Sequence, residues 1–429
     1  MSQGPGDMRP STGERLRAEM DFIIELSLVV ASNWELQPIL DWIVSKTTTM
    51  FRAEEGSIRV LNDDGSVGGL TDLKTIQRFL LEGSASGSWP QDIALSVMGY
   101  LMTGREEVCA TPDLVADDRF PSLRGKDTKI RSMLAVPLKV GDRFTGMLAV
   151  TSPKPGRQWA ADEVKLLTIV GRNSAVVIEK AQFKIKATEF EDDLRTAKVI
   201  QQNLLPSAPL RVGCWEGVGR VVAAHHVGGD AFDYFLFDRS RAAIVIGDVS
   251  GKSTPAAMLM SHVQAKVKAR CDGRTPIPEA MAIVNEEMLR SAPRYVTLFV
   301  GELDASRKLL RYTNAGHNYP LVRRTDGTLE DLNQGGFPIG MFPGAKYEQG
   351  ECVFGPGDSL LLYSDGITDQ EDVRRKRYGE EALRAVWQAE GGRRPHDSIE
   401  RIFAAVEAHR GNARQSDDMT LLVIGSPAA

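Results

Sequence analysis

Four aspartates stand at the edges of apolar runs in the second half of this chain, and together they could act as metal ligands. They are Asp230, Asp248, Asp365 and Asp417. Each neighbouring run has the length and composition of a buried strand. A carboxylate at the edge of such a strand lies close to a low-dielectric core, where an unpaired negative charge is costly. Carboxylate oxygens favour Mg²⁺ or Mn²⁺ over zinc or copper, so the pattern predicts that these side chains converge on such cations.

The bulk composition narrows the class of protein. A chain of 429 residues predicts two or three domains, and 42% hydrophobic with 25% charged residues is typical of a globular protein. A net charge of −5 argues against a nucleic-acid partner recognised by bulk charge. The four cysteines lack metal-ligand spacing and are expected to be reduced thiols. Without a signal-peptide core or a run of membrane-spanning length, we expect a soluble, cytoplasmic protein with no membrane partner.

The first half of the chain combines helical and strand patterns. Residues 1–13 are rich in Gly, Pro and polar groups and are expected to form a flexible tail. Residues 14–181 are expected to form one domain. Within it the patterns predict helices over 14–29, 39–50 and 161–181, strands over 56–61, 132–140 and 146–151, and a hairpin turn at 62–65.

Part of this region resembles the GAF domain, a module that senses small molecules and proteins. The resemblance rests on Arg131–Leu138, Gly146–Val150 and Trp159–Leu167, with Asp117–Phe120 upstream. It covers roughly residues 20–180 and implies an α/β sandwich with a sensory role. No set of residues identifies the GAF ligand. Cys109 fits a small buried hydrophobe better than a chromophore attachment point.

A long helix without Gly or Pro is predicted from about residue 172 to 205, and its last part, 182–205, is read as a linker. Apolar residues recur every seven positions, while the companion positions three residues earlier are mixed. The repeating residues are Ile169, Val176, Phe183, Phe190, Ala197 and Leu204. This pattern favours a coiled coil and a parallel homodimer. The alternative is a helix that packs its apolar edge on a neighbouring domain.

Residues 198–426 carry ordered motifs that resemble the bacterial sporulation stage II E-type phosphatases, a branch of the protein phosphatase 2C superfamily, and the domain itself is assigned to residues 206–429. The motifs are Gln201–Pro206, Val227–Asp233, Gly247–Lys252, Pro255–Met258, Thr313–Asn318, Tyr363–Asp369 and Asp417–Leu421. The resemblance implies an α-β-β-α fold and two Mn²⁺ or Mg²⁺ ions. Carried over by position, it implies that the metal ligands are Asp230, Asp248 (which would bridge the ions), Asp365, Asp417 and the backbone carbonyl of Val249.

The function implied by this resemblance is hydrolysis of phosphoserine or phosphothreonine in a protein, regulated by the GAF domain. Two divalent cations would supply an activated water for attack on phosphorus and would neutralise charge on the phosphoryl oxygens. In many relatives the substrate is a phosphorylated anti-sigma-factor antagonist. Two alternatives stay open: a catalytically degenerate sensor or scaffold, and a phosphatase of small molecules.

The roles of several nearby residues are left open by the sequence. Asp233 could support the metal centre or cap a turn. Asp418 is expected to point away from Asp417 if the segment is extended. His317 could be a general acid or could hydrogen-bond a turn, and His225 and His226 could reach the site.

A helix is predicted to follow Pro255 and to end near Arg270, with Ala256, Met258, Leu259, Val263 and Val267 as its apolar residues. Because it begins just after the Asp248 loop, its movement could switch the site on or off. Ser253 stands where the family usually has glycine, which could alter that loop.

Overall fold

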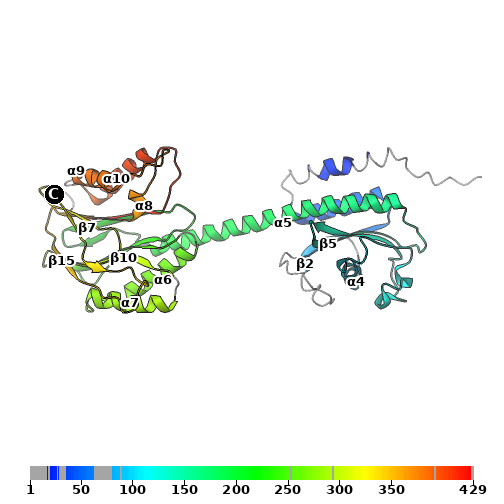
Figure 1. Cartoon of the computed structure of the whole chain (residues 1–429), viewed down its shortest axis with the longest axis horizontal. Coiled ribbons are helices and arrows are strands. Elements are labelled where there is room, and N and C mark those ends of the chain that lie inside the picture. The colour runs from blue at the N-terminus through cyan, green and yellow to red at the C-terminus, as the bar shows by residue number, and fades with distance from the viewer. Residues whose placement is uncertain are drawn as a thin grey trace, which may run out of the picture. The chain divides into compact units, whose positions relative to one another are not determined.

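The structure is a computed structural model that describes residues 17, 20–26, 28, 35–61, 80–86, 89–251, 254–291, 294–390 and 393–426. The chain divides into two compact units, Met1–Phe190 and Glu191–Ala429 (Figure 1). The predicted tail at 1–13, the hairpin turn at 62–65 and Ser253 lie outside the described residues. Within the predicted helix at 14–29, residues 17, 20–26 and 28 are described and are helical.

The first unit is built on one sheet with the strand order β2-β1-β5-β4-β3. Its strands are β1 (Glu55–Leu61), β2 (Leu80–Ser86), β3 (Cys109–Thr111), β4 (Ser132–Val140) and β5 (Arg143–Ser152). Its helices are α2 (Leu36–Met50), α4 (Gln91–Met102), the first part of α5 (Ala161–Leu204) and two short 3₁₀ turns, Leu114–Ala116 and Pro121–Leu123. One core joins the sheet to α2 and α5, and a second joins its other face to α4. This confirms the predicted α/β sandwich.

The predicted elements of this unit agree closely with the observed ones. The strand at 132–140 has the predicted limits, and the next strand starts at Arg143 because it pairs with Val140 in a tight hairpin. The helix at 161–181 and the linker form one continuous helix of 44 residues, α5. Gly171 lies inside α5 because an added Cβ there would come within 2.7 Å of Val136, so the helix needs glycine to approach β4.

The second unit contains two stacked sheets. The first sheet has the order β14-β11-β10-β9-β8, with β15 also paired to β11. Its strands are β8 (Asp230–Leu236), β9 (Arg241–Val249), β10 (Val296–Asp304), β11 (Leu309–Ala315), β14 (Gly335–Gly336) and β15 (Gly350–Val353). The second sheet has the order β13-β12-β16-β17-β7-β6. Its strands are β6 (Leu210–Val212), β7 (Trp215–Val222), β12 (Leu321–Arg323), β13 (Leu329–Asp331), β16 (Ser359–Tyr363) and β17 (Met419–Gly425).

Helices cover both outer faces of this sandwich (Figure 1). They are α6 (Thr254–Arg270), α7 (Ile277–Ser291), α8 (Asp365–Thr368), α9 (Glu380–Ala389) and α10 (Pro395–Arg410). A core that includes Phe232, Phe299 and Leu422 fills the space between the sheets. Separate cores join one sheet to α6 and α7 and the other to α9 and α10. The predicted α-β-β-α fold is therefore confirmed.

Helix α6 forms where it was predicted, but its apolar residues do not all face inward. Met258 is 70% exposed, whereas Met260 is buried with Ala256, Val263 and Val267. These buried positions recur at the helical period, and Met258 falls on the opposite face.

The apolar repeat of α5 is largely exposed. Phe183 and Phe190 are 75% and 63% exposed, and Val176 and Leu204 are 39% and 46% exposed. Within the described ranges, none of the helices combines the length and the apolar composition needed to cross a membrane.

Candidate metal centre

Strand pairing places Asp230 and Asp248 side by side. Asp230 is the first residue of β8 and lies directly opposite Asp248 on the antiparallel strand β9. Opposite residues of an antiparallel pair project from the same face of a sheet. Asp230 projects into the space between the two sheets, because its carboxylate Oδ2 accepts a hydrogen bond of 2.7 Å from Thr420 Oγ1 on the other sheet.

The second sheet contributes two hydroxyl residues that sequence reasoning missed, Ser364 and Thr420. Thr420 donates a hydrogen bond to the Asp230 carboxylate, and Ser364 acts with it to lower the pKa of that carboxyl. The two residues also bond each other, since the Thr420 amide donates to Ser364 Oγ at 2.9 Å. Each lies within three residues of a predicted ligand, in the motifs Tyr-Ser-Asp-Gly and Asp-Asp-Met-Thr. That position was the only signal in the sequence, because the partner Asp230 is 190 residues from Thr420.

Asp365 and Asp417 come from the same end of the second sheet. Asp365 follows β16 and begins the short helix α8, and Asp417 precedes β17, which pairs with β16. The two segments lie in very close contact at Gly366. An added Cβ there would lie 1.8 Å from the carbonyl oxygen of Asp418. Glycine at 366 is therefore what lets the two acidic segments approach each other.

The raised pKa values of Asp230 and Asp248 indicate that these carboxylates lie close enough to act on each other through their charges. The pKa of Asp248 is raised to about 7, first by burial and then by the negative charge of Asp365, with further contributions from Asp417 and Asp418. The pKa of Asp230 is raised well above its usual value by burial and by the charge of Asp248, while the bonds from Ser364 and Thr420 oppose this. Like charges held together in a buried site raise carboxylate pKa values in this way.

The donor set suits hard divalent cations. Neither Asp230 nor Asp248 forms an ion pair with a basic side chain in the described part of the chain. Gly229 keeps the Val249 carbonyl oxygen accessible. A Cβ added at Gly229 would lie 3.2 Å from that oxygen. Four carboxylates would balance the charge of two divalent cations.

The four carboxylates do not surround a common point closely enough to bind a cation. Among the described residues, no group of three or more His, Cys, Asp or Glu has the spacing of a formed metal site. Asp230 and Asp248 lie opposite each other on β8 and β9, and binding a cation would require a further carboxylate to move closer. Mutual repulsion of like charges opposes that movement, and a cation removes the repulsion.

Removing the Thr420 hydroxyl tests this arrangement. We expect Thr420→Val to lower Mn²⁺ affinity by about 10–100-fold, the usual effect of losing a residue that orients a ligand. Isothermal titration calorimetry would measure it, and Thr420→Ser, which keeps the hydroxyl, should retain the affinity. An unchanged affinity in Thr420→Val would show that the bond to Asp230 does not orient a ligand.

Asp418 and Asp233 each have hydrogen-bond partners of their own. The Asp418 carboxylate accepts hydrogen bonds from the amides of Ala224 and Gly229, at 2.8 and 2.7 Å, and so anchors the loop that leads into Asp230. Asp233 projects from the opposite face of β8, since side chains alternate along a strand. It accepts a hydrogen bond of 3.2 Å from Gln264 on α6. Asp233 therefore ties β8 to α6.

The three histidines are placed differently. His317 is buried, with its ring Nδ1 2.9 Å from Thr297 Oγ1, and its amide donates to Asn314 Oδ1 at 2.7 Å. Burial lowers the pKa of His317 to about 4, so the ring is neutral at pH 7. These contacts favour the structural role in the turn over general acid catalysis. His225 and His226 are exposed on the loop before Asp230.

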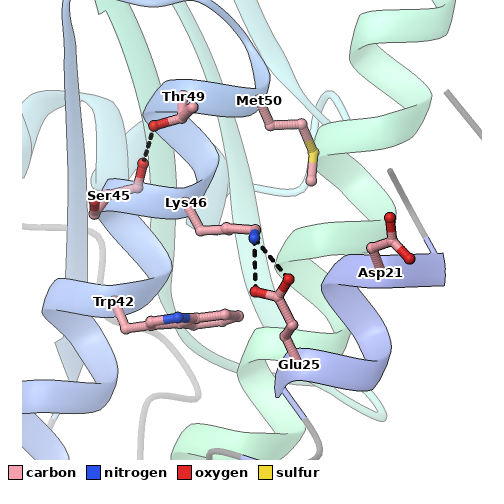
Figure 2. A pocket seen from close by; sticks show the side chains of 7 residues that line it. All are labelled: Asp21, Glu25, Trp42, Ser45, Lys46, Thr49 and Met50. Carbon is pink, nitrogen blue, oxygen red and sulfur yellow. Dashed lines mark hydrogen bonds and ion pairs between the residues drawn. The ribbon is translucent and has the colours of Figure 1, made fainter. Parts of the chain in front are cut away.

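The first unit carries a surface pocket of about 320 Å³ (Figure 2). Figure 2 shows Lys46 reaching across it to Glu25, with Nζ–Oε distances of 2.8 and 2.6 Å. Trp42 lines the same pocket and stacks on Phe22. Because Lys46 is paired with Glu25, the pocket identifies no ligand class. Cys109 is fully buried, as predicted, and burial raises its pKa to about 12.

Comparison with known families agrees with this geometry. Residues 35–178 match the GAF domain, and residues 238–427 match Stage II sporulation protein E (SpoIIE). The chain joins a GAF domain to a SpoIIE-family domain. Asp248, Asp365 and Asp417 lie within the stretch matched to SpoIIE, and Asp230 lies eight residues before it.

Two curated relatives and one solved structure show what the two domains resemble. Protein IcfG of Synechocystis is 25% identical over 61% of this chain and 46% of its own length. Phosphoserine phosphatase RsbU of Bacillus subtilis is 26% identical over 42% of this chain and 55% of its own. The chain thus spans about half the length of these relatives. The SiaA-PP2C domain of Pseudomonas aeruginosa, 20% identical, matches 56% of this chain and 97% of that domain with a TM-score of 0.50, so the SpoIIE-family domain shares its fold.

Proposed function

We propose that this protein is a serine/threonine protein phosphatase that depends on two Mn²⁺ or Mg²⁺ ions and is regulated by its GAF domain. The observation that carries the proposal is that Asp230 and Asp248 lie opposite each other while the charges of Asp365 and Asp417, from the other sheet, act on Asp248. Asp230, Asp248, Asp365 and Asp417 would hold the ions, together with the carbonyl of Val249. Similarity to a phosphoserine phosphatase supports the reaction class.

The chain's own groups would organise the centre as follows. When bound, the ions would activate a water for attack on phosphorus and neutralise phosphoryl charge. Asp248 would lie between the two ions, because it is the carboxylate that interacts with both Asp230 and Asp365. Ser364 and Thr420 would hold Asp230, and Asp418 would fix the backbone that leads to it.

The proposed substrate is a phosphorylated signalling protein, such as an anti-sigma-factor antagonist. The test is a screen of phosphorylated antagonist proteins from the same genome, beside phosphopeptides and nucleotides, with and without Mn²⁺. Manganese-dependent hydrolysis of one antagonist is the expected result. Hydrolysis of nucleotides alone would favour the small-molecule alternative. Absence of hydrolysis of every phosphomonoester would favour the degenerate scaffold.

We further propose a homodimer formed through α5. The exposed stripe that includes Phe183 and Phe190 supports it, because an apolar seam of this kind needs a covering partner. Sedimentation equilibrium should give twice the mass of the chain, and Phe183→Glu should shift the protein toward monomer. A monomeric mass for the unmodified chain would contradict this proposal.

Regulation would pass through the end of α5. The Gln201 side chain makes two hydrogen bonds with the backbone of Gly228, at 2.7 and 3.1 Å, two residues before Asp230. Gln264 of α6 donates to the Leu204 carbonyl at 3.0 Å and also to Asp233. The linker is thus bonded both to the loop that carries a proposed ligand and to the helix that follows Asp248.

Loss of the Gln201 contacts should uncouple the linker from the site. Two hydrogen bonds of about 1 kcal/mol each correspond to an effect of about 30-fold, so we expect Gln201→Leu to change phosphatase activity by up to that factor. Steady-state kinetics would measure the change, with Gln202→Leu as the control because Gln202 is exposed. Equal activities of the two variants would argue against this route.

The domain limits and the location belong to the same proposal. We divide the chain into a tail at 1–13, a GAF domain at 14–181, a linker at 182–205 and a phosphatase domain at 206–429. The boundary between the compact units, after Phe190, lies inside that linker and supports the division. A cytoplasmic location is part of this proposal, on the grounds given by the sequence.

A further inference from the structure

Two exposed aromatic side chains flank Ile339, which pairs with β10 at the end that lies opposite Val249. Phe337 and Phe342 are 59% and 48% exposed, and their rings pack edge to face with centroids 5.1 Å apart. Tyr295, nearby, is 42% exposed. We propose that this aromatic face, together with Arg294, docks the polypeptide segment that carries the substrate's phosphoserine or phosphothreonine. The inference rests on the proposed function and extends it to substrate recognition.

The backbone connects this face to the carboxylates. Ile339, between the two phenylalanines, pairs with Val296 through hydrogen bonds of 2.9 and 2.8 Å. Val296 lies opposite Val249, the residue after Asp248. Adjacent strands are about 4.8 Å apart, so Ile339 lies about 10 Å from the backbone at Val249. A peptide whose phosphoryl group reached the carboxylates could therefore contact the aromatic pair with a neighbouring residue.

Arg294 supplies the charge that a phosphoryl group needs. Its Nη1 donates to the Ser250 carbonyl at 3.1 Å, so the guanidinium lies against the loop that follows Asp248. Gly251 makes room for it, since this glycine has φ +100° and an added Cβ would lie 2.4 Å from Nη1. Across the described ranges, Arg294 forms no ion pair with a carboxylate. A half-buried guanidinium with free donors is suited to binding phosphate oxygens.

The aromatic face is held rigidly. Asn285 of α7 is fully buried and bonds two backbone groups of the loop: its Oδ1 accepts from the Gly340 amide at 2.8 Å and its Nδ2 donates to the Phe342 carbonyl at 2.9 Å. Rigid exposed aromatic side chains lose little entropy on binding and are enriched where proteins bind each other. Arg294 would bind the phosphoryl group, and the aromatic face would contact an apolar residue next to the phosphorylated one.

Kinetics on two substrates test the docking proposal. We would compare Phe337→Ser/Phe342→Ser with the unmodified protein on p-nitrophenyl phosphate and on the antagonist protein that is dephosphorylated fastest in the screen above. The ratio of kcat/KM for the phosphoprotein to that for the aryl phosphate should fall at least about 10-fold, as for loss of an interface hot spot. Phe337→Ser alone would be used if the double variant unfolds.

A matched control is available on the same sheet. Val353 is 68% exposed but pairs with Leu309, at the opposite end of β11 from the metal centre. Val353→Ser should leave the ratio unchanged. Arg294→Lys keeps the positive charge but loses the planar guanidinium with its paired N–H donors. Because both substrates carry a phosphoryl group, kcat/KM should fall for both.

The possible outcomes separate this inference from the proposed function. Absence of hydrolysis of p-nitrophenyl phosphate by the unmodified protein would remove the proposed function itself. Hydrolysis of the aryl phosphate but of no phosphoprotein, or an unchanged ratio in the phenylalanine variants, would overturn the docking site alone. An unchanged ratio with a change in oligomeric mass would instead show that the face joins two copies. Unaltered kinetics in Arg294→Lys would overturn the assignment of Arg294.

Discussion

Replacing Asp248 by asparagine should abolish manganese-dependent phosphatase activity, with a loss of about 1000-fold or more. Asp248 is the carboxylate whose pKa responds to Asp365 and Asp417 and which lies opposite Asp230, so it occupies the centre of the group. An amide keeps the shape but removes the negative charge that would bridge two cations. Metal-ion stabilisation of several kcal/mol corresponds to such a loss, since each 1.36 kcal/mol is a factor of ten.

The same variant should become more stable in the absence of metal. Removing one of several like charges from a buried group relieves repulsion, so the melting temperature of metal-free Asp248→Asn should exceed that of the unmodified protein. Added Mn²⁺ should then raise it less. Thermal melts with and without Mn²⁺ would show both effects, and a fall in metal-free stability would contradict the proposed crowding of charges.

Asp233→Asn is the matched control for Asp248→Asn. Asp233 is also a buried aspartate of the same strand pair, and burial raises its pKa too. It projects from the opposite face, toward Gln264. We expect this variant to keep most of the activity. Equal losses of activity in the two variants would show that the carboxylates around Asp248 have no special part in catalysis.

Gly366→Ala should disrupt both the stability of the second unit and its activity. An added Cβ would lie 1.8 Å from the Asp418 carbonyl oxygen, a backbone atom that cannot simply rotate away. Overpacking of this kind costs about 3 kcal/mol or more. Because the strain would separate Asp365 from the segment of Asp417, activity should fall by about 100-fold, the usual effect of a displacement near 1 Å.

Urea denaturation would measure the loss of stability of the second unit, and steady-state kinetics would measure the loss of activity. Gly355→Ala is the control, since the nearest atom to its added Cβ is a carboxylate oxygen of Asp358 at 3.8 Å. It should leave stability and activity nearly unchanged. Tolerance of alanine at 366 would mean that the two acidic segments need not lie in contact.

Local patterns were sufficient for most of the fold. The strand at 132–140 has its predicted limits because alternating and continuous apolar residues define a buried strand within a few positions. The same reasoning placed the aspartates at strand edges. The helical period could also have separated Met258 from the buried face of α6, since Met260 fits that period and Met258 does not.

The amino-acid sequence alone determined which carboxylates stand at strand ends and which segments form the two domains, because both depend on short-range periodicity. Only the tertiary structure decided that Thr420 bonds Asp230, that Gln201 bonds Gly228, and that burial keeps His317 neutral. These contacts join residues that are distant in the chain. They depend on how strands pair and sheets stack, and no local pattern of residues contains that information.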